Sequence, residues 1–378
     1  MKTAVIISLI VFPILCFANP QSDKETDELI IFHTFSGEWE KADSLLQLQI
    51  SKYPDNPKYY ALQGPYYFYT RYFQPRILNN DSLTQEIAES AYKAIEFGEK
   101  DAMSLDDKFF VGTAYGYLSR YYVSRGSFWD AYWATRSCRA YLNEVLEEDP
   151  TYTDAKMGLA VIEYFTATRL RGFWGFVAWV VGMSGNRDTA LMQFHDVAEH
   201  GYWFQFEAQF ALSAVYRYFE TDYVQAYAII TPLHERFPQN GWISAQYRVL
   251  RFFDLVENRG IDFLENEFDS LQTTYQVNNA TILNEFGYAL YFVNRLDEAL
   301  KTFKANIKLY PNAANGYDSL AEVYEALGND DMALHYTRIC LEKLPVDSTI
   351  SDNFREIIRE ACDSRLERFG ADSGKLNI

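Results

Sequence analysis

Two stretches near the C-terminus repeat each other: TILNEFGYALYFVNRLDEALKTFKANIKLYP at 281–311 and NGYDSLAEVYEALGNDDMALHYTRICLEKLP at 315–345. Their closing prolines, Pro311 and Pro345, lie 34 residues apart. Large apolar residues in the first half of each stretch recur at intervals of three and four, the spacing of one face of a helix. Proline cannot continue a helix, so it ends each unit. A repeat of this period predicts a solenoid of stacked helix pairs.

The two stretches share small, apolar and turn-forming residues at matching positions. The first has Leu283, Phe286, Gly287, Leu290, Ala299, Phe303 and Pro311, and the second has Tyr317, Leu320, Ala321, Tyr324, Ala333 and Pro345. This pattern resembles the tetratricopeptide repeat (TPR) family, whose repeats are pairs of helices, A and B. The resemblance implies an all-α fold, an αα superhelix. Cys340 departs from the family pattern, because it replaces the second alanine of helix B.

The same register extends towards the N-terminus. Ala42 precedes Pro54, and Ala226 precedes Pro238, by the interval that separates Ala299 from Pro311. We therefore predict about eight helix pairs followed by a capping helix, because the end of a solenoid needs a polar cover. The predicted segments are a first repeat at 19–56, degenerate repeats at 57–205, further repeats at 206–279, two well-formed repeats at 280–347, and a capping helix and tail at 348–378.

Two insertions, at 65–82 and 170–187, are predicted to interrupt the repeats. Pro65 is expected to kink a helix or delay its start. The second insertion contains an apolar run from 171 to 183, for which three interpretations stay open. It is a helix buried in the superhelix, or it is a patch that docks on a membrane or an apolar partner through Phe173, Trp174, Phe176 and Trp179. The third is a spanning or re-entrant segment, although about a dozen residues are too few to cross a bilayer. Residues 150–205 also resemble the inclusion-body-clearance branch of the TPR family.

The first 18 residues have the pattern of an export signal. Lys2 precedes an apolar run from Ala4 to Phe17, and cleavage is expected before Asn19. A lipid-modified Cys16 and an uncleaved anchor are the alternatives. We expect an exported protein, in the periplasm or outer envelope of a bacterium, or secreted.

Cleavage of this signal would leave three cysteines. They are Cys138, Cys340 and Cys362, and an odd number argues against a disulfide framework. Cys340 and Cys362 would meet if the last helix folded back on the one before it. Buried free thiols are the alternative.

Charge and motifs narrow the function classes. The chain has 34 basic and 52 acidic residues and a net charge of −18, which repels nucleic acid. The sequence has no glycine-rich phosphate loop, no nucleophile elbow and no pair of histidines at helical spacing. We therefore predict a protein without catalytic, cofactor or metal sites. A glycan-active enzyme with a carboxylate-based site is kept as an alternative.

The TPR resemblance implies that helix A of each pair lines a binding groove. The implied groove residues are Asn284, Tyr288, Tyr291 and Phe292 in one repeat, Asp318 and Glu322 in the next, and Tyr218 and Phe219 upstream. A groove that is aromatic and acidic suits an extended apolar or basic peptide, and it would repel a peptide carboxylate. We predict an exported scaffold or adaptor that binds a protein or an extended peptide. The alternative is a membrane-peripheral accessory protein that docks through 171–183.

Overall fold

The computed structural model describes residues 20–72, 81–100, 102–169 and 185–370, and in these ranges the regular structure is helical throughout. The predicted all-α fold class is confirmed. The helices that precede residue 201 are α1 (Pro20–Ser36), α2 (Trp39–Lys52), α3 (Pro57–Tyr72), α4 (Asp81–Gly98), α5 (Leu105–Ser124), α6 (Phe128–Glu148), α7 (Ala155–Arg169) and α9 (Arg187–His200).

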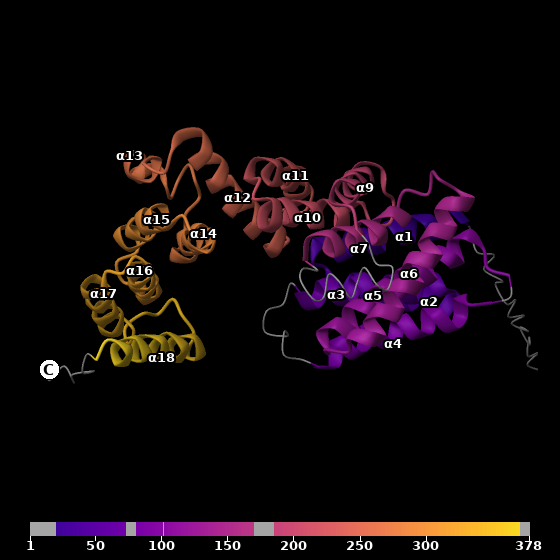
Figure 1. The fold of residues 1–378 in the computed structure, drawn as a ribbon, viewed down its shortest axis with the longest axis horizontal. Coiled ribbons are helices and arrows are strands. Elements are labelled where there is room, and N and C mark those ends of the chain that lie inside the picture. Colours follow the sequence, from indigo (N-terminus) through magenta and orange to yellow (C-terminus); the bar gives the residue numbers. More distant parts are fainter. Residues whose placement is uncertain (1–19, 73–80, 101, 170–184, 371–378) are drawn as a thin grey trace, which may run out of the picture. The chain divides into compact units, whose positions relative to one another are not determined.

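The remaining helices continue the same alternation (Figure 1). They are α10 (Gln205–Val215), α11 (Tyr223–Arg236), α12 (Gly241–Arg259), α13 (Phe263–Asn266), α14 (Ala280–Phe292), α15 (Leu296–Leu309), α16 (Ala314–Ala326), α17 (Asp330–Lys343) and α18 (Asp352–Arg368). A π-helical turn, Tyr216–Glu220, extends α10, and a 3-10 turn, Phe268–Ser270, follows α13. Consecutive helices therefore form eight pairs in the described ranges, and α18 follows the last pair.

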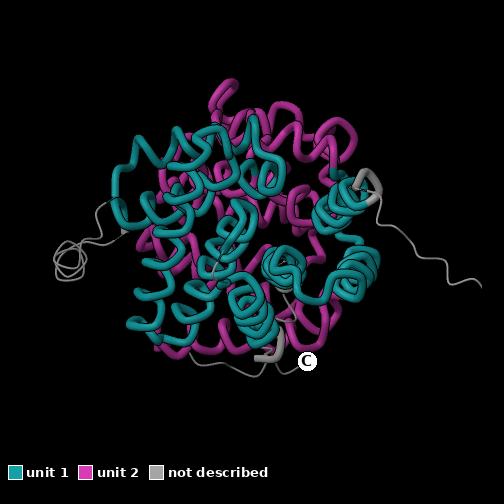
Figure 2. Tube along the Cα trace, turned by 90° about the vertical axis from the view of Figure 1, so that its right-hand side faces the viewer, with its two compact units in different colours: residues 1–209, 237–240 teal, residues 210–236, 241–378 magenta. Residues whose placement is uncertain are grey.

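The chain divides into two compact units (Figure 2). Unit 1 comprises residues up to 209 together with 237–240, and unit 2 comprises 210–236 and the chain from 241 onwards. The division falls within α10, between Gln209 and Phe210.

The last two pairs of unit 2 have the same helix bounds, displaced by 34 residues. The A helices begin at Ala280 and Ala314, and the B helices begin at Leu296 and Asp330. Gly287 is needed at the helix crossing, because a Cβ built on it would lie 2.4 Å from a ring carbon of Phe303. The periodicity seen in the sequence is thus a periodicity of helix pairs.

One alanine marks the same place in helix B of several pairs. Ala42, Ala226, Ala299 and Ala333 are all fully buried. A methyl group is small enough for helix A to pack closely against helix B at this point. The register predicted from these alanines is therefore present in both units.

The expected interruption at 65–82 begins within α3 and ends at the start of α4. Pro65 lies inside α3, which continues to Tyr72, and α4 begins at Asp81. The residue before a proline normally avoids the helical conformation because its Cβ meets the proline ring. Gly64 has no Cβ, which removes this part of the clash, and the helix continues through Pro65. Residues 73–80 lie outside the described ranges.

The helix that follows the second expected insertion is α9. Helix α9 begins at Arg187, and the Asn186 side chain caps it by accepting a hydrogen bond from the Thr189 amide. Residues 170–184, which include Phe173, Trp174, Phe176 and Trp179, lie outside the described ranges, as do residues 1–19. The predicted patch and the predicted signal therefore stay predictions.

The interior of unit 1 is filled by side chains that are distant in sequence. Phe35 of α1 contacts Tyr69 of α3 and Phe206 of α10, with ring centroids 4.9 and 5.7 Å apart. The Asn240 side chain donates a hydrogen bond of 2.8 Å to the Phe35 carbonyl. These contacts join the first helix pair of unit 1 to residues about 200 positions later in the chain.

Candidate binding surface of unit 2

The A helices of the last two pairs share one face. Ser319 of α16 donates a hydrogen bond of 2.9 Å to the Asn284 side chain of α14. Tyr288 of α14 donates one of 2.8 Å to Glu322 of α16. Three of the predicted groove residues, Asn284, Tyr288 and Glu322, thus take part in contacts between the A helices.

Tyr288 organises an aromatic cluster on this face. Its ring stacks on Phe292 at 5.9 Å and meets Phe303 edge-on at 5.3 Å. Burial, followed by the nearby Glu322 charge, raises the pKa of Tyr288 above its ordinary value, so the hydroxyl stays protonated and able to donate. Tyr288 is therefore mainly a support for its neighbours.

Phe292 is the most exposed large apolar side chain in the described ranges, with 78% of its surface accessible. It lies at the end of α14 beside Tyr291, whose ring centroid is 5.6 Å away. We call Tyr288, Tyr291, Phe292 and Glu322 the groove cluster. In this cluster the exposed Phe292 ring stacks on Tyr288, which is hydrogen-bonded to the Glu322 carboxylate.

The acidic residues at the end of the predicted groove are engaged by the capping helix. Asp318 is buried and forms a 2.8 Å ion pair with Arg365 of α18. Glu325 pairs with both Arg365 and Arg368. Burial opposes ionisation of Glu325, but the two guanidinium groups outweigh it and lower its pKa. These arginines were not anticipated from the sequence, since no local pattern connects them to α16.

The upstream groove residues lie in the π-helical turn after α10. Tyr218 is 55% exposed, and the Arg217 guanidinium lies 4.6 Å from its ring centroid. Phe219 is half-buried. A π-helical turn shifts the side-chain register by one position, which the repeat pattern does not reveal. Tyr218 is therefore an exposed aromatic residue on a separate helix pair from the groove cluster.

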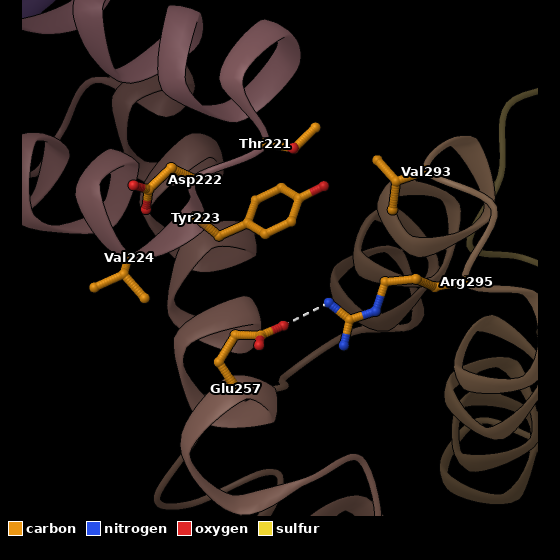
Figure 3. Close-up of a pocket in the computed structure, with 7 residues that line it drawn as sticks. All are labelled: Thr221, Asp222, Tyr223, Val224, Glu257, Val293 and Arg295. Atoms are coloured by element: carbon orange, nitrogen blue, oxygen red, sulfur yellow. Dashed lines mark hydrogen bonds and ion pairs between the residues drawn. The ribbon is translucent and has the colours of Figure 1, made fainter.

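An open cleft lies at the edge formed by turns between helices A and B (Figure 3). It has a volume of about 610 Å3 and is lined by Thr221, Asp222, Tyr223, Val224, Glu257, Val293 and Arg295. Arg295 bridges to Glu257 at 2.6 Å, and Tyr223 stacks on Phe253 at 3.8 Å. Asp222 caps α11 by accepting the Gln225 amide. Both carboxylates in the cleft thus hold the local structure together.

Comparisons with known proteins find likeness among solved structures. Pseudomonas aeruginosa PilF is 16% identical over 68% of this chain and 99% of its own, with a TM-score of 0.30. A tetratricopeptide repeat protein from Parabacteroides merdae is 13% identical over 92% of this chain and 99% of its own, with a TM-score of 0.30. Human IFIT1 is 13% identical over 82% of this chain and 69% of its own, with a TM-score of 0.33. No protein-family model and no curated protein matches the sequence.

These scores are too low to support an argument about function. The repeat register decides the fold: two consecutive helix pairs have the same bounds 34 residues apart, with Gly287 and Ala321 at the crossing. The chain has the TPR fold. The similar structures do not identify a binding partner for this chain. The kind of partner has to be inferred from the residues on the face of the A helices.

Within the part of the chain that the structure describes, no group of three His, Cys, Asp or Glu side chains is placed to hold a metal ion. No helix in the same ranges is long and apolar enough to cross a bilayer.

Proposed function

We propose that this TPR chain is an exported, noncatalytic scaffold that binds an extended protein segment through the groove cluster of unit 2. The proposal rests on Phe292, whose side chain is 78% exposed although its ring stacks on the Tyr288 ring. A supported aromatic ring loses little conformational freedom on binding, so it makes an effective anchor at a protein interface.

The chemistry of the cluster favours a segment with an apolar and a basic side chain. Phe292 and Tyr291 supply the apolar contact area. Glu322 accepts one hydrogen bond from Tyr288, and a carboxylate has further acceptor positions for a lysine or arginine. The net charge of −18 would speed the approach of a basic partner.

Peptide selection tests this proposal. The mature chain would be used to select binders from a random peptide display library, and affinities would be measured by calorimetry. We expect the selected peptides to combine an apolar anchor with Lys or Arg. Phe292→Ala should weaken them about tenfold or more, whereas the control Val346→Ala, at a residue 73% exposed in the turn after α17, should not.

A second substitution tests the charge. Glu322→Gln keeps the hydrogen bond from Tyr288 but removes the charge, so it should weaken binding of basic peptides and reduce its dependence on salt. Equal binding by the wild type and Phe292→Ala would refute the groove assignment. Tyr288 should not be truncated, because its loss would disturb the packing of Phe303.

Of the two alternatives, neither is favoured by a described contact. Docking through 171–183 would be tested by vesicle flotation of Trp174→Ser with Trp179→Ser. A glycan-active enzyme needs two carboxylates that can exchange protons with substrate. In the cleft of unit 2, Asp222 serves as a helix cap and Glu257 as an ion-pair partner.

A further inference from the structure

An exposed aromatic stripe runs along the start of α6 in unit 1. Its members are Phe128, Trp129, Tyr132 and Trp133, and the exposed fractions of Phe128, Trp129 and Trp133 are 61, 68 and 56%. The opposite face of α6 carries buried Ala131, Ala134, Cys138, Leu142 and Val145. The helix thus has apolar side chains on both faces, and packing against its own helix pair accounts for only one of them.

Indole side chains are usually covered in folded chains, so two exposed ones on adjacent turns indicate an interaction surface. Trp129 and Tyr132 have centroids 5.8 Å apart at an interplanar angle of 83°, and Tyr132 and Trp133 are 5.1 Å apart at 67°. The rings therefore meet edge-on and are not stacked on one another.

The local charge of the stripe is opposite to that of the chain. Between residues 123 and 136 the charged side chains are Arg125, Asp130 and Arg136, a net charge of +1 in a chain of −18. The Arg136 guanidinium lies 5.5 Å from the Trp133 ring centroid. Tryptophan and tyrosine accompanied by arginine are typical of the headgroup region of a bilayer, where ring and cation each meet a suitable environment.

Helix α7, which packs beside α6, ends at the same edge of unit 1. Helices α6 and α7 are antiparallel, because Gly158 packs on Leu142 while Glu163 pairs with Arg139 at 3.3 Å. Continuing this register places the end of α7 level with Trp133. The chain returns at Gly185, which packs on the backbone of Glu163 and Ala167. Helix α7 therefore ends, and the described chain resumes at Gly185, near the level of Trp133 on α6.

We infer that the aromatic stripe of α6 is an interfacial membrane-binding surface, which inserts its indole rings among phospholipid headgroups. This surface is in unit 1 and does not depend on the peptide-binding role proposed for unit 2. Binding would come from the rings, with the two arginines adding attraction to anionic lipid.

The test is partition of the mature full-length protein onto lipid vesicles, with and without phosphatidylglycerol in phosphatidylcholine. The stripe variant is Trp129→Ser with Trp133→Ser. Its matched control is Leu48→Ser with Met192→Ser, which removes two apolar side chains of unit 1 that are 59 and 66% exposed on α2 and α9. Circular dichroism and thermal unfolding would establish that both variants fold.

We expect the wild type and the control to bind vesicles and the stripe variant to partition about tenfold less or worse. A third variant, Trp174→Ser with Trp179→Ser, separates the stripe from the apolar run. If that variant alone loses binding while the stripe variant retains it, the inference is wrong. It is also wrong if the wild type does not bind vesicles. In that case, a dimer that is seen by ultracentrifugation and abolished only in the stripe variant would show that the stripe binds a second copy of the chain.

Discussion

Arg365 of α18 and Asp318 of α16 form a 2.8 Å ion pair in which the side chains are only 5% and 11% exposed. Asp318 also accepts a contact from the Cys362 thiol, and Arg365 reaches the Thr337 hydroxyl. The capping helix therefore supplies the partner of a carboxylate that the sequence pattern assigns to the groove. The last repeat uses this acidic residue to hold the cap.

Removal of Arg365 should destabilise unit 2 strongly. Arg365→Ala leaves the Asp318 carboxylate buried without its charged partner, and we expect a loss of about 3 kcal/mol in the free energy of unfolding. Urea unfolding and limited proteolysis of the C-terminal helix would measure it. Arg359→Ala is the control, because the ion pair of Arg359 with Glu356 lies at the surface and its loss should change stability by less than about 1 kcal/mol. Similar losses in both variants would contradict the role assigned to the buried pair.

Cys340 and Cys362 are expected to form a disulfide under oxidising conditions. Both thiols are fully buried in one core cluster between α17 and α18, and Cys362 shares a hydrogen bond with Cys340 that, together with burial, raises the pKa of Cys340. The raised pKa should make oxidation slow, because the thiolate is the reactive form. Glutathione disulfide would accept the two electrons and be released as two reduced glutathione molecules.

Maleimide labelling in denaturant, followed by peptide mapping, would identify the linked cysteines. We expect Cys138 to remain reduced and the linked protein to gain about 3 kcal/mol of stability. Cys362→Ser should abolish the bond. Three free thiols after prolonged oxidation, or a bond to Cys138, would show that the pair is not positioned to react.

Gly287→Ala should destabilise the first of the two regular pairs. The added methyl group would overlap the Phe303 ring, at a cost of about 1–3 kcal/mol. The next repeat has Ala321 in place of Gly287 and Thr337 in place of Phe303, 34 residues later. The larger residue at the helix crossing is thus combined with a smaller one on helix B. Phe303→Leu should therefore lessen the effect of Gly287→Ala, and a double-mutant cycle in urea would reveal the coupling. Gly241→Ala, in open space, is the control.

Glu207 should give unit 1 a characteristic pH dependence. Its carboxylate is buried, accepts a 2.9 Å hydrogen bond from Tyr117 and lies 3.5 Å from Arg120. Burial raises the pKa of Glu207, with Arg120 and Tyr117 opposing the rise. A raised folded-state pKa contributes stability that is complete below the unfolded pKa and is lost as the pH rises through the folded value.

The variant Glu207→Gln lacks this titration. The stability of the wild type relative to Glu207→Gln should therefore be greatest near pH 4 and should decrease as the pH rises. Thermal unfolding of both proteins across that range would measure the difference. A constant difference, or one that increases with pH, would show that the pKa of Glu207 is not raised in the folded protein.

Much of the architecture could be predicted from the sequence because its cause is local. Three features depend on residues that are close in sequence and can therefore be read from it. They are the 34-residue period, the buried alanines of helix B and the capping residue Asn186. Pro65 shows the limit of such patterns. The proline alone predicts an interruption, whereas Gly64 before it lets the helix continue.

The candidate surfaces could be predicted only in part. The aromatic positions Tyr288, Tyr291 and Phe292 follow from the register of helix A, and their differing exposure does not. The Tyr288 hydroxyl forms hydrogen bonds with Glu322 and Ser319, while the Phe292 side chain is exposed to solvent. The stripe of α6 is visible in the sequence as four aromatic residues among six, but only packing shows that two tryptophans stay uncovered.

The sequence by itself determined which segments pair into helices, because pairing depends on side chains a few turns apart. Tertiary structure alone decided which polar groups lie buried together. Arg365 meets Asp318 across 47 residues, and Tyr117 meets Glu207 across 90. The physical reason is that stacking brings side chains of different pairs into one low-dielectric interior, where a charge must find a partner. The periodic pattern of the sequence does not predict which residue will be the partner of a buried charge.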